Sequence, residues 1–119
     1  MSALDAAAVI IDLLQRGHAV EFRVRGDSMH PVIREDDAVH VEPVREVEAG
    51  DVALTLAERG LTAHRVVSVL NGIVVTRGDN ATSDDDPLPL ERVLGKVTWV
   101  ERGGRRRGVA RRWWHLLRR

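Results

Sequence analysis

The sequence predicts a mostly β, antiparallel domain with a short N-terminal helix and a basic C-terminal amphipathic helix. Three observations predict this fold class. Residues 20–25, VEFRVR, alternate apolar and charged side chains, and this period of two is typical of a half-buried strand. Asn71-Gly72 lies between two apolar runs and is the strongest short signal for a β-hairpin. Apolar residues recur at helical spacing only near the two ends of the chain.

The composition is typical of a globular domain and excludes several kinds of chemistry. The chain has 119 residues, of which 44% are hydrophobic and 30% charged, and this suits one domain with a single core. It contains no cysteine, so disulfides, thiol catalysis and cysteine-based zinc sites are excluded. No apolar run approaches the roughly 18 residues of a membrane span, and the N-terminus lacks the features of a secretory signal. We therefore expect a cytoplasmic protein without a transmembrane segment.

Residues 1–17 are predicted to form the N-terminal helix. Ser2 is the expected N-cap, Asp5 completes a capping-box spacing, and Gly17 suits the position after the last turn. The apolar residues between them give the helix one apolar face. We interpret it as a helix that packs on the domain, and binding of a partner is the alternative.

Residues 18–102 are predicted to form the core of the protein as antiparallel strands joined by short turns. Turn residues at 58–60 and at Asn71-Gly72 separate consecutive apolar runs, as in a series of hairpins. Residues 81–90 contain three aspartates and two prolines and are predicted to be a loop. The predicted strands cover residues 20–25, 37–44, 52–57, 61–69, 73–77 and 92–101.

Residues 103–119 form a basic tail on an otherwise acidic chain. Residues 101–119 hold eight Arg and one Glu, which leaves 10 basic and 17 acidic residues elsewhere. The Gly-Gly pair at 103–104 is predicted to be a hinge. A helix from about Arg107 would then place Val, Trp and Leu on one side and Arg on the rest, as in helices that lie on membrane surfaces. Peripheral membrane contact through residues 104–119 is one interpretation. Packing on the domain or on a second subunit is another, and nucleic-acid binding by a disordered tail is disfavoured.

Ser28, in the stretch RVRGDSMHPVIREDD, is a candidate nucleophile if a neighbouring base can take its proton. Lys96 is the only lysine and lies late in the chain, in a strand pattern. Among the five histidines, His64 lies inside a strong strand pattern. A polar ring at such a position indicates a specific structural or catalytic role. The aspartates of TRGDNATSDDD can supply the acceptor that orients a histidine base. From the residues alone, Ser28 can equally be a polar loop residue, His64 a structural histidine and the aspartates a solvated loop.

Six short boxes follow one another along residues 18–100 and together resemble the type I signal peptidases and the related LexA-type self-cleaving peptidases. GDSMHP resembles their G-x-S-M-x-P box. The next five resemble the acidic turn with its strand, the Gly-Asp strand start, the segment of the catalytic base, the Gly-Asp-Asn box and the closing strand. In this chain they read IREDDAVHVEP, AGDVALT, AHRVVSV, TRGDNATSDD and RVLGKV. The resemblance implies the antiparallel β-fold of that superfamily.

The resemblance also implies a role for each candidate residue. The base position is a lysine in most bacterial signal peptidases and LexA relatives. Here it is His64, as in the archaeal and endoplasmic-reticulum variety that uses Ser, His and Asp. Ser28 is then the nucleophile and His64 the general base. Asp85 is favoured as the carboxylate that orients His64, with Asp84 as the near alternative, and Asp79 takes a supporting or structural role.

The resemblance places the oxyanion hole at the turn formed by Gly26, Ser28 and Met29. The backbone N–H of Ser28 and a nearby donor are expected to stabilise the oxyanion. Gly26 permits a close turn, and Met29 is expected to pack beneath the site. No cofactor or metal is expected, because the chain has no HExxH, P-loop, GxGxxG or C2H2 motif.

The function implied by the resemblance is endopeptidase cleavage of a leader or signal-like segment from a peptide or protein substrate. The substrate is expected to be extended, to pair with a strand edge beside Ser28 and to carry small residues at P1 and P3. The alternative is a catalytically inactive peptide-binding or regulatory module of the same fold. Unlike the signal peptidases, this chain is expected to have no transmembrane anchor, and unlike the LexA relatives it is expected to have no DNA-binding domain.

Overall fold

The computed structural model describes residues 3–58 and 60–109, with side chains from residue 6 onward. This part of the chain is mostly antiparallel β with one short N-terminal helix, as the sequence predicts. No helix in the described ranges has the length and apolar character needed to cross a membrane. The elements are α1 (Ala3–Gln15), β1 (Val20–Arg23), β2 (Ala38–Glu42), β3 (Val52–Ala57), β4 (Gly60–Leu70), β5 (Ile73–Arg77), β6 (Leu88–Pro89), η1 (Leu90–Arg92), β7 (Val93–Arg102) and β8 (Arg105–Gly108).

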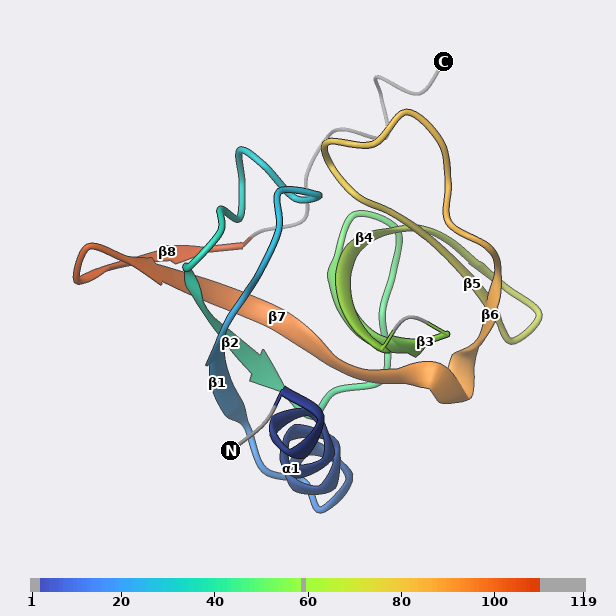
Figure 1. Cartoon of the computed structure of the whole chain (residues 1–119). Coiled ribbons are helices and arrows are strands. Elements are labelled where there is room, and N and C mark those ends of the chain that lie inside the picture. The colour runs from blue at the N-terminus through green and yellow to red at the C-terminus, as the bar shows by residue number, and fades with distance from the viewer. Residues whose placement is uncertain (1–2, 59, 110–119) are drawn as a thin grey trace.

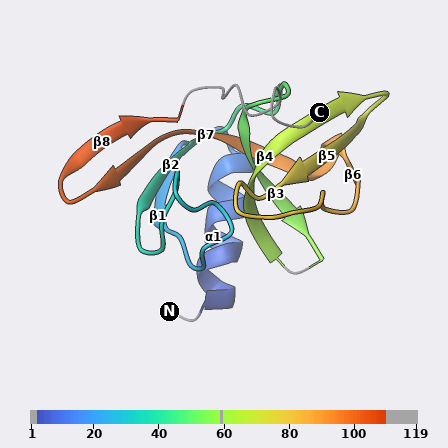
Figure 2. The same ribbon diagram turned by 90° about the horizontal axis from the view of Figure 1, so that it is seen from above.

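The strands form one antiparallel sheet in the order β1-β2-β7-β3-β4-β5-β6, and β8 pairs with β7. The long strand β7 joins the two halves of the sheet, because one part of it pairs with β2 and β8 and the other with β3. Figure 1 shows the sheet curling at β3 and β4, with α1 near the end of β1. Figure 2 shows the same arrangement from above.

The main hydrophobic core lies where β2, β3 and β7 meet α1. Val39 and Val41, which the period of two places on one face of β2, are both fully buried. Leu14 of α1 belongs to the same cluster, so the helix packs on the domain as predicted. Met29 and Ile33 join this cluster from the segment between β1 and β2. The core therefore anchors the segment that carries Ser28.

The hairpin predicted at Asn71-Gly72 is confirmed. Asn71 and Gly72 have φ angles of 52° and 75°, and they connect β4 to β5. Positive φ at both central positions is the geometry of the type I′ turn, whose twist matches that of antiparallel strands. The turn pairs Leu70 with Ile73, and a β-bulge between Val66 and Ser68 then brings Arg65 of β4 opposite Arg77 at the far end of β5. The start of β4 and the end of β5 therefore lie side by side.

The hinge predicted at Gly103 and Gly104 is wrong. Both residues have positive φ, and they form the tight turn of a hairpin in which Arg102 pairs with Arg105. β8 extends to Gly108, so the described chain is strand, not helix, where the predicted helix begins. The remainder of that predicted amphipathic helix, residues 110–119, lies outside the described residues. The loop predicted at 81–90 also contains the two-residue strand β6, which pairs with β5.

Candidate active site

Ser28 lies on a loop between β1 and β2 that is closed at its base and anchored from below. The Val24 N–H donates to Asp37 O at 3.1 Å, and the Asp36 N–H donates to Val24 O at 3.0 Å. Met29 is only 4% exposed, whereas the neighbouring Ser28 is exposed. Because the Met29 side chain is held in the core, the chain turns the Ser28 side chain outward.

A half-buried ion pair fixes the exit of this loop to β7. Asp37 is 3% exposed, and its carboxylate accepts two hydrogen bonds from the Arg102 guanidinium at 2.6 and 2.8 Å. The hydrogen bond from Arg102 lowers the pKa of the Asp37 carboxyl; burial opposes this shift, and the backbone N–H of Arg34 adds to it. Arg102 also donates to the Val32 carbonyl at 3.4 Å. The loop that carries Ser28 is thus tied to the β7–β8 hairpin.

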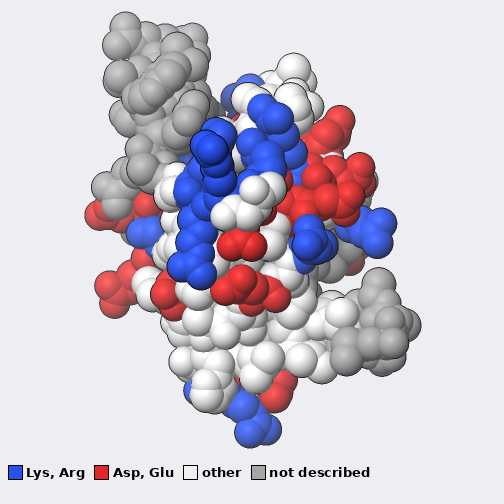
Figure 3. All heavy atoms as spheres, turned by 90° about the vertical axis from the view of Figure 1, so that its left-hand side faces the viewer, with Lys and Arg blue, Asp and Glu red and all other residues white. Residues whose placement is uncertain are grey.

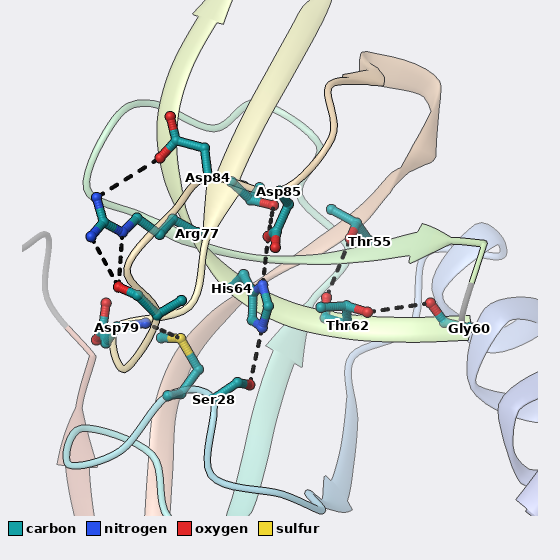
Figure 4. Close-up of polar contacts among 12 residues, drawn as sticks. Ser28, Thr55, Gly60, Thr62, His64, Arg77, Asp79, Asp84 and Asp85 are labelled. Atoms are coloured by element: carbon teal, nitrogen blue, oxygen red, sulfur yellow. Dashed lines mark hydrogen bonds and ion pairs between the residues drawn. The ribbon is translucent and has the colours of Figure 1, made fainter.

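His64 lies between Ser28 and Asp85 and contacts both (Figure 4). Its Nε2 is 3.0 Å from Ser28 Oγ, and its Nδ1 is 2.6 Å from Asp85 Oδ2. A carboxylate only accepts hydrogen bonds, so Nδ1 carries the ring hydrogen and Nε2 presents a lone pair to the serine hydroxyl. The ring is only 14% exposed, whereas Ser28 is open to solvent. This arrangement can take a proton from Ser28.

Asp85 is itself held in place by Thr76 of β5. The Thr76 hydroxyl donates to Asp85 Oδ2 at 2.7 Å, and the Asp85 N–H donates to the Thr76 carbonyl at 2.8 Å. Thr76 is 2% exposed, so this support comes from inside the sheet. Asp84, the near alternative, is exposed, and its carboxylate lies 4.0 Å from Arg77. Of these two adjacent aspartates, the structure brings Asp85 into contact with His64.

Asp79 contacts Arg65 rather than His64. Arg65 Nε and Nη2 donate to the two carboxylate oxygens of Asp79 at 3.1 and 2.7 Å. Arg65 is 1% exposed, and its Nη1 also donates to the Gly50 carbonyl at 2.9 Å. The pair bridges β4 and the loop after β5. This placement is the one expected of a supporting residue.

The Gly78-Asp79-Asn80 segment is hydrogen-bonded to the loop that carries Ser28. The Asn80 N–H donates to Ser28 O at 2.9 Å, and its side-chain Nδ2 donates to Asp27 O at 3.2 Å. The Asp79 N–H is 3.4 Å from the Met29 sulfur. These contacts come from the adjacent residues Asp79 and Asn80 of the Gly-Asp-Asn box. The box holds the nucleophile loop against the strand that carries His64.

Gly78, Thr76 and Arg65 are residues of the site to which sequence reasoning assigned no role. A Cβ on Gly78 would lie 2.6 Å from Ser28 O, closer than such atoms approach in proteins. The signal for Gly78 was its place in the Gly-Asp-Asn box. The signal for Arg65 was a charged residue beside His64 in an apolar strand pattern. Thr76 had no sequence signal, because threonine is common in strands.

The turn before Ser28 has the geometry that Gly26 permits. Gly26 has a φ of 86°, and its N–H donates to Glu35 Oε1 at 3.3 Å. Within the described ranges no group accepts a hydrogen bond from the backbone N–H of Ser28 or of Met29. These two N–H groups are therefore the candidate donors to an oxyanion on a substrate carbonyl.

Lys96 takes no part in the contacts around Ser28 described above. It lies on β7, and its Nζ is 3.5 Å from Asp51 Oδ1. The described residues contain no group of three or more His, Cys, Asp or Glu side chains that could hold a metal ion. The group that contacts the Ser28 hydroxyl is His64.

Comparison with known proteins gives one family match. The family model described as Peptidase S24-like matches residues 3–98, which include Ser28, His64, Asp79 and Asp85. No curated protein matches the chain.

Proposed function

Because the chain belongs to the Peptidase S24-like family, we propose that it is a serine endopeptidase of signal-peptidase-like type that works through Ser28, His64 and Asp85. The observation that carries this proposal is the continuous path from Ser28 Oγ through the His64 ring to the Asp85 carboxylate, at 3.0 and 2.6 Å. A serine hydroxyl needs a base to become a useful nucleophile, and an imidazole base needs an orienting acceptor. In this proposal His64 on β4 is the base, and Asp85 in the loop after β5 is the acceptor that orients it.

In the proposed reaction, Ser28 Oγ attacks the carbonyl carbon of the scissile peptide bond. His64 Nε2 takes the hydroxyl proton, and the carbonyl oxygen becomes an oxyanion facing the backbone N–H groups of the nucleophile turn. His64 then gives its proton to the leaving amine, and the C–N bond breaks to leave an acyl group on Ser28. Water, deprotonated by the same imidazole, releases the acyl group and restores the serine. Asp85 accepts the Nδ1 hydrogen throughout and stabilises the imidazolium.

We propose a peptide or protein with a leader or signal-like segment as the substrate. The sequence resemblance to signal peptidases supports this choice, and so does the exposure of Ser28 on a loop that directly follows the edge strand β1. An extended peptide can add to such an edge through backbone hydrogen bonds, which leaves selection to a few side-chain pockets. Small residues at P1 and P3 are expected from the resemblance.

Incubation with candidate leader peptides, followed by mass spectrometry, tests this function. The proposal predicts one cut site, with loss of cleavage in Ser28→Ala and in His64→Ala while circular dichroism stays that of the wild type. The competing function is an inactive peptide-binding or regulatory module of the same fold. It predicts tight peptide binding without cleavage, unchanged by Ser28→Ala.

A further inference from the structure

Thr76 is a polar residue on an apolar face of β5. Its side chain is 2% exposed, and the alternation along the strand places it on the same face as Val74, which is fully buried in a second cluster of apolar side chains. Valine has nearly the same shape and a high preference for strands, so it would satisfy the packing here. A buried hydroxyl costs free energy unless it finds an acceptor. Threonine at position 76 therefore indicates a use for its hydroxyl.

The acceptor of this hydroxyl is Asp85 Oδ2, the same oxygen that accepts the ring hydrogen of His64. Thr76 Oγ1 and His64 Nδ1 lie 2.7 and 2.6 Å from it. Among the residues that the structure describes, no other side chain hydrogen-bonds to this carboxylate. The Asp85 side chain is 37% exposed, so the carboxylate has room to turn toward solvent. The Thr76 hydroxyl opposes that rotation.

The backbone contact between the same two residues cannot orient the carboxylate by itself. The Asp85 N–H donates to the Thr76 carbonyl at 2.8 Å, which fixes the Asp85 backbone. The last torsion of an aspartate side chain is broad, so a fixed backbone still leaves the carboxylate free to rotate. A threonine side chain is branched at Cβ and stiff, so its hydroxyl keeps one direction. The two contacts together hold both the backbone and the carboxylate of Asp85.

This donor is neutral, and three other aspartates of the chain have charged partners instead. Asp37, Asp79 and Asp84 each lie within 4.0 Å of an arginine. On the face shown in Figure 3, acidic side chains likewise lie among basic ones. An arginine would also orient a carboxylate, but its positive charge would offset the negative charge that stabilises an imidazolium. The Thr76 hydroxyl orients Asp85 and leaves its charge in place.

We propose that Thr76 is a positioning residue whose hydroxyl sets the direction of the Asp85 carboxylate. The carboxylate held in this way keeps the ring hydrogen of His64 on Nδ1, so that Nε2 presents its lone pair to Ser28. The consequence for cleavage rests on the proposed function. The consequence for the His64 tautomer does not, and it can be measured in a chain that cleaves no peptide.

Nitrogen-15 NMR of the histidine rings tests the tautomer at about pH 8, where an ordinary imidazole is neutral. We expect the wild-type chain to carry the His64 hydrogen on Nδ1 alone. Thr76→Val should show a mixture of the two tautomers, because the carboxylate can then turn away. Thr76→Ser should keep the wild-type tautomer, because serine retains the hydroxyl. His64→Gln identifies the signals of this ring.

The matched control is Thr55→Val, which removes the hydroxyl of another buried strand threonine. Thr55 on β3 is 1% exposed, and its Oγ1 donates to the Thr62 carbonyl at 3.4 Å (Figure 4). This variant should keep the wild-type tautomer. An unchanged tautomer in Thr76→Val would overturn the proposal, and so would an equal change in Thr55→Val. If Thr76→Val does not fold, Thr76→Ala and Thr76→Ser replace it, because they differ only in the hydroxyl and should differ in the tautomer.

Steady-state cleavage of a leader peptide measures the consequence for the reaction. Thr76→Val should lower kcat by about 10–100-fold and leave KM nearly unchanged, because it displaces the proton-transfer groups and not the substrate. Added to Asp85→Asn it should cause no further loss, since it acts through that carboxylate. Losses that add in the double variant would contradict the proposal. Absence of cleavage by the wild type would instead count against the proposed function, and the tautomer would still decide the role of Thr76.

Discussion

Gly78 lies directly against the Ser28 carbonyl, where a Cβ atom would be 2.6 Å from the oxygen and 3.3 Å from His64 Nε2. This contact places the loop after β5 against Ser28 and His64, the two residues between which the proton would be transferred. The 2.6 Å clash would be with backbone, which cannot swing aside as a flexible side chain does. Glycine at this position is therefore required by close approach.

Gly78→Ala should lower the rate of leader-peptide cleavage by about 100-fold or more, because small displacements of reacting groups have effects of this size. Overpacking should also lower the free energy of unfolding by about 1–3 kcal/mol. Cleavage assays and urea denaturation measure the two effects. The control is Gly108→Ala, since a Cβ there meets nothing within 4 Å. Equal activity of the two variants would contradict this account of Gly78.

Asp85→Asn should reduce kcat by about 10²–10⁴, because an amide no longer fixes the Nδ1 hydrogen of His64 or stabilises the imidazolium. Asp84→Asn, one residue earlier, serves as the control and should cleave at close to the wild-type rate, since Asp84 lies beside Arg77. Steady-state cleavage of one leader peptide by both variants makes the comparison. If Asp84→Asn proved the slower enzyme, the orienting carboxylate would be misassigned.

Asp79→Asn should destabilise the fold by about 1–3 kcal/mol, because it weakens the two hydrogen bonds that the Arg65 guanidinium donates to the Asp79 carboxylate. Arg65 is 1% exposed and cannot turn to solvent. The exposed pair of Asp12 and Arg16 provides the contrast, and Asp12→Asn should change stability by about 0.5 kcal/mol or less. Denaturant unfolding gives both values. A similar small effect for both variants would show that the Arg65–Asp79 pair does not support the loop.

Asp37→Asn should show a stability loss that depends on pH. Arg102 lowers the pKa of Asp37 in the folded chain, so the carboxylate stabilises the fold above its unfolded pKa of about 3.9. This contribution is lost as pH falls through the lower folded value. The difference in unfolding free energy between wild type and variant should be constant from pH 7 to about 5 and shrink below about 4. A difference that stays constant throughout the acid range would exclude this linkage.

Most of the fold is predictable from local pattern, and part of the site is predictable from the order of the boxes. Alternation gives β1 and β2, and Asn71-Gly72 gives the turn between β4 and β5. Ser28, His64 and Asp85 are 36 and 21 residues apart, so no local rule brings them together. The resemblance to a known family predicts the three residues together. It favours Asp85 but leaves the adjacent Asp84 as the near alternative, because the choice depends on the path of the loop after β5.

β8 and Gly78 could not be predicted, for different physical reasons. The stretch RRRG lacks alternating apolar residues, and its pairing depends on contacts with β7, such as that of Arg106 with Trp99. A Gly-Gly pair followed by arginines therefore indicated a hinge, although the two glycines form a hairpin turn. The need for glycine at Gly78 arises only when the Ser28 loop folds over it. Non-local packing determines both features.

The most direct test of the central claim is the rate at which a library of leader-like peptides with small residues at P1 and P3 is cleaved. Wild type, Ser28→Ala, His64→Ala and His30→Ala are compared, with cut sites identified by mass spectrometry. His30 is an exposed histidine two residues from Ser28, and its variant controls for loss of an imidazole nearby. The account predicts cleavage by wild type and His30→Ala and none by the other two. Undiminished cleavage by His64→Ala would contradict it.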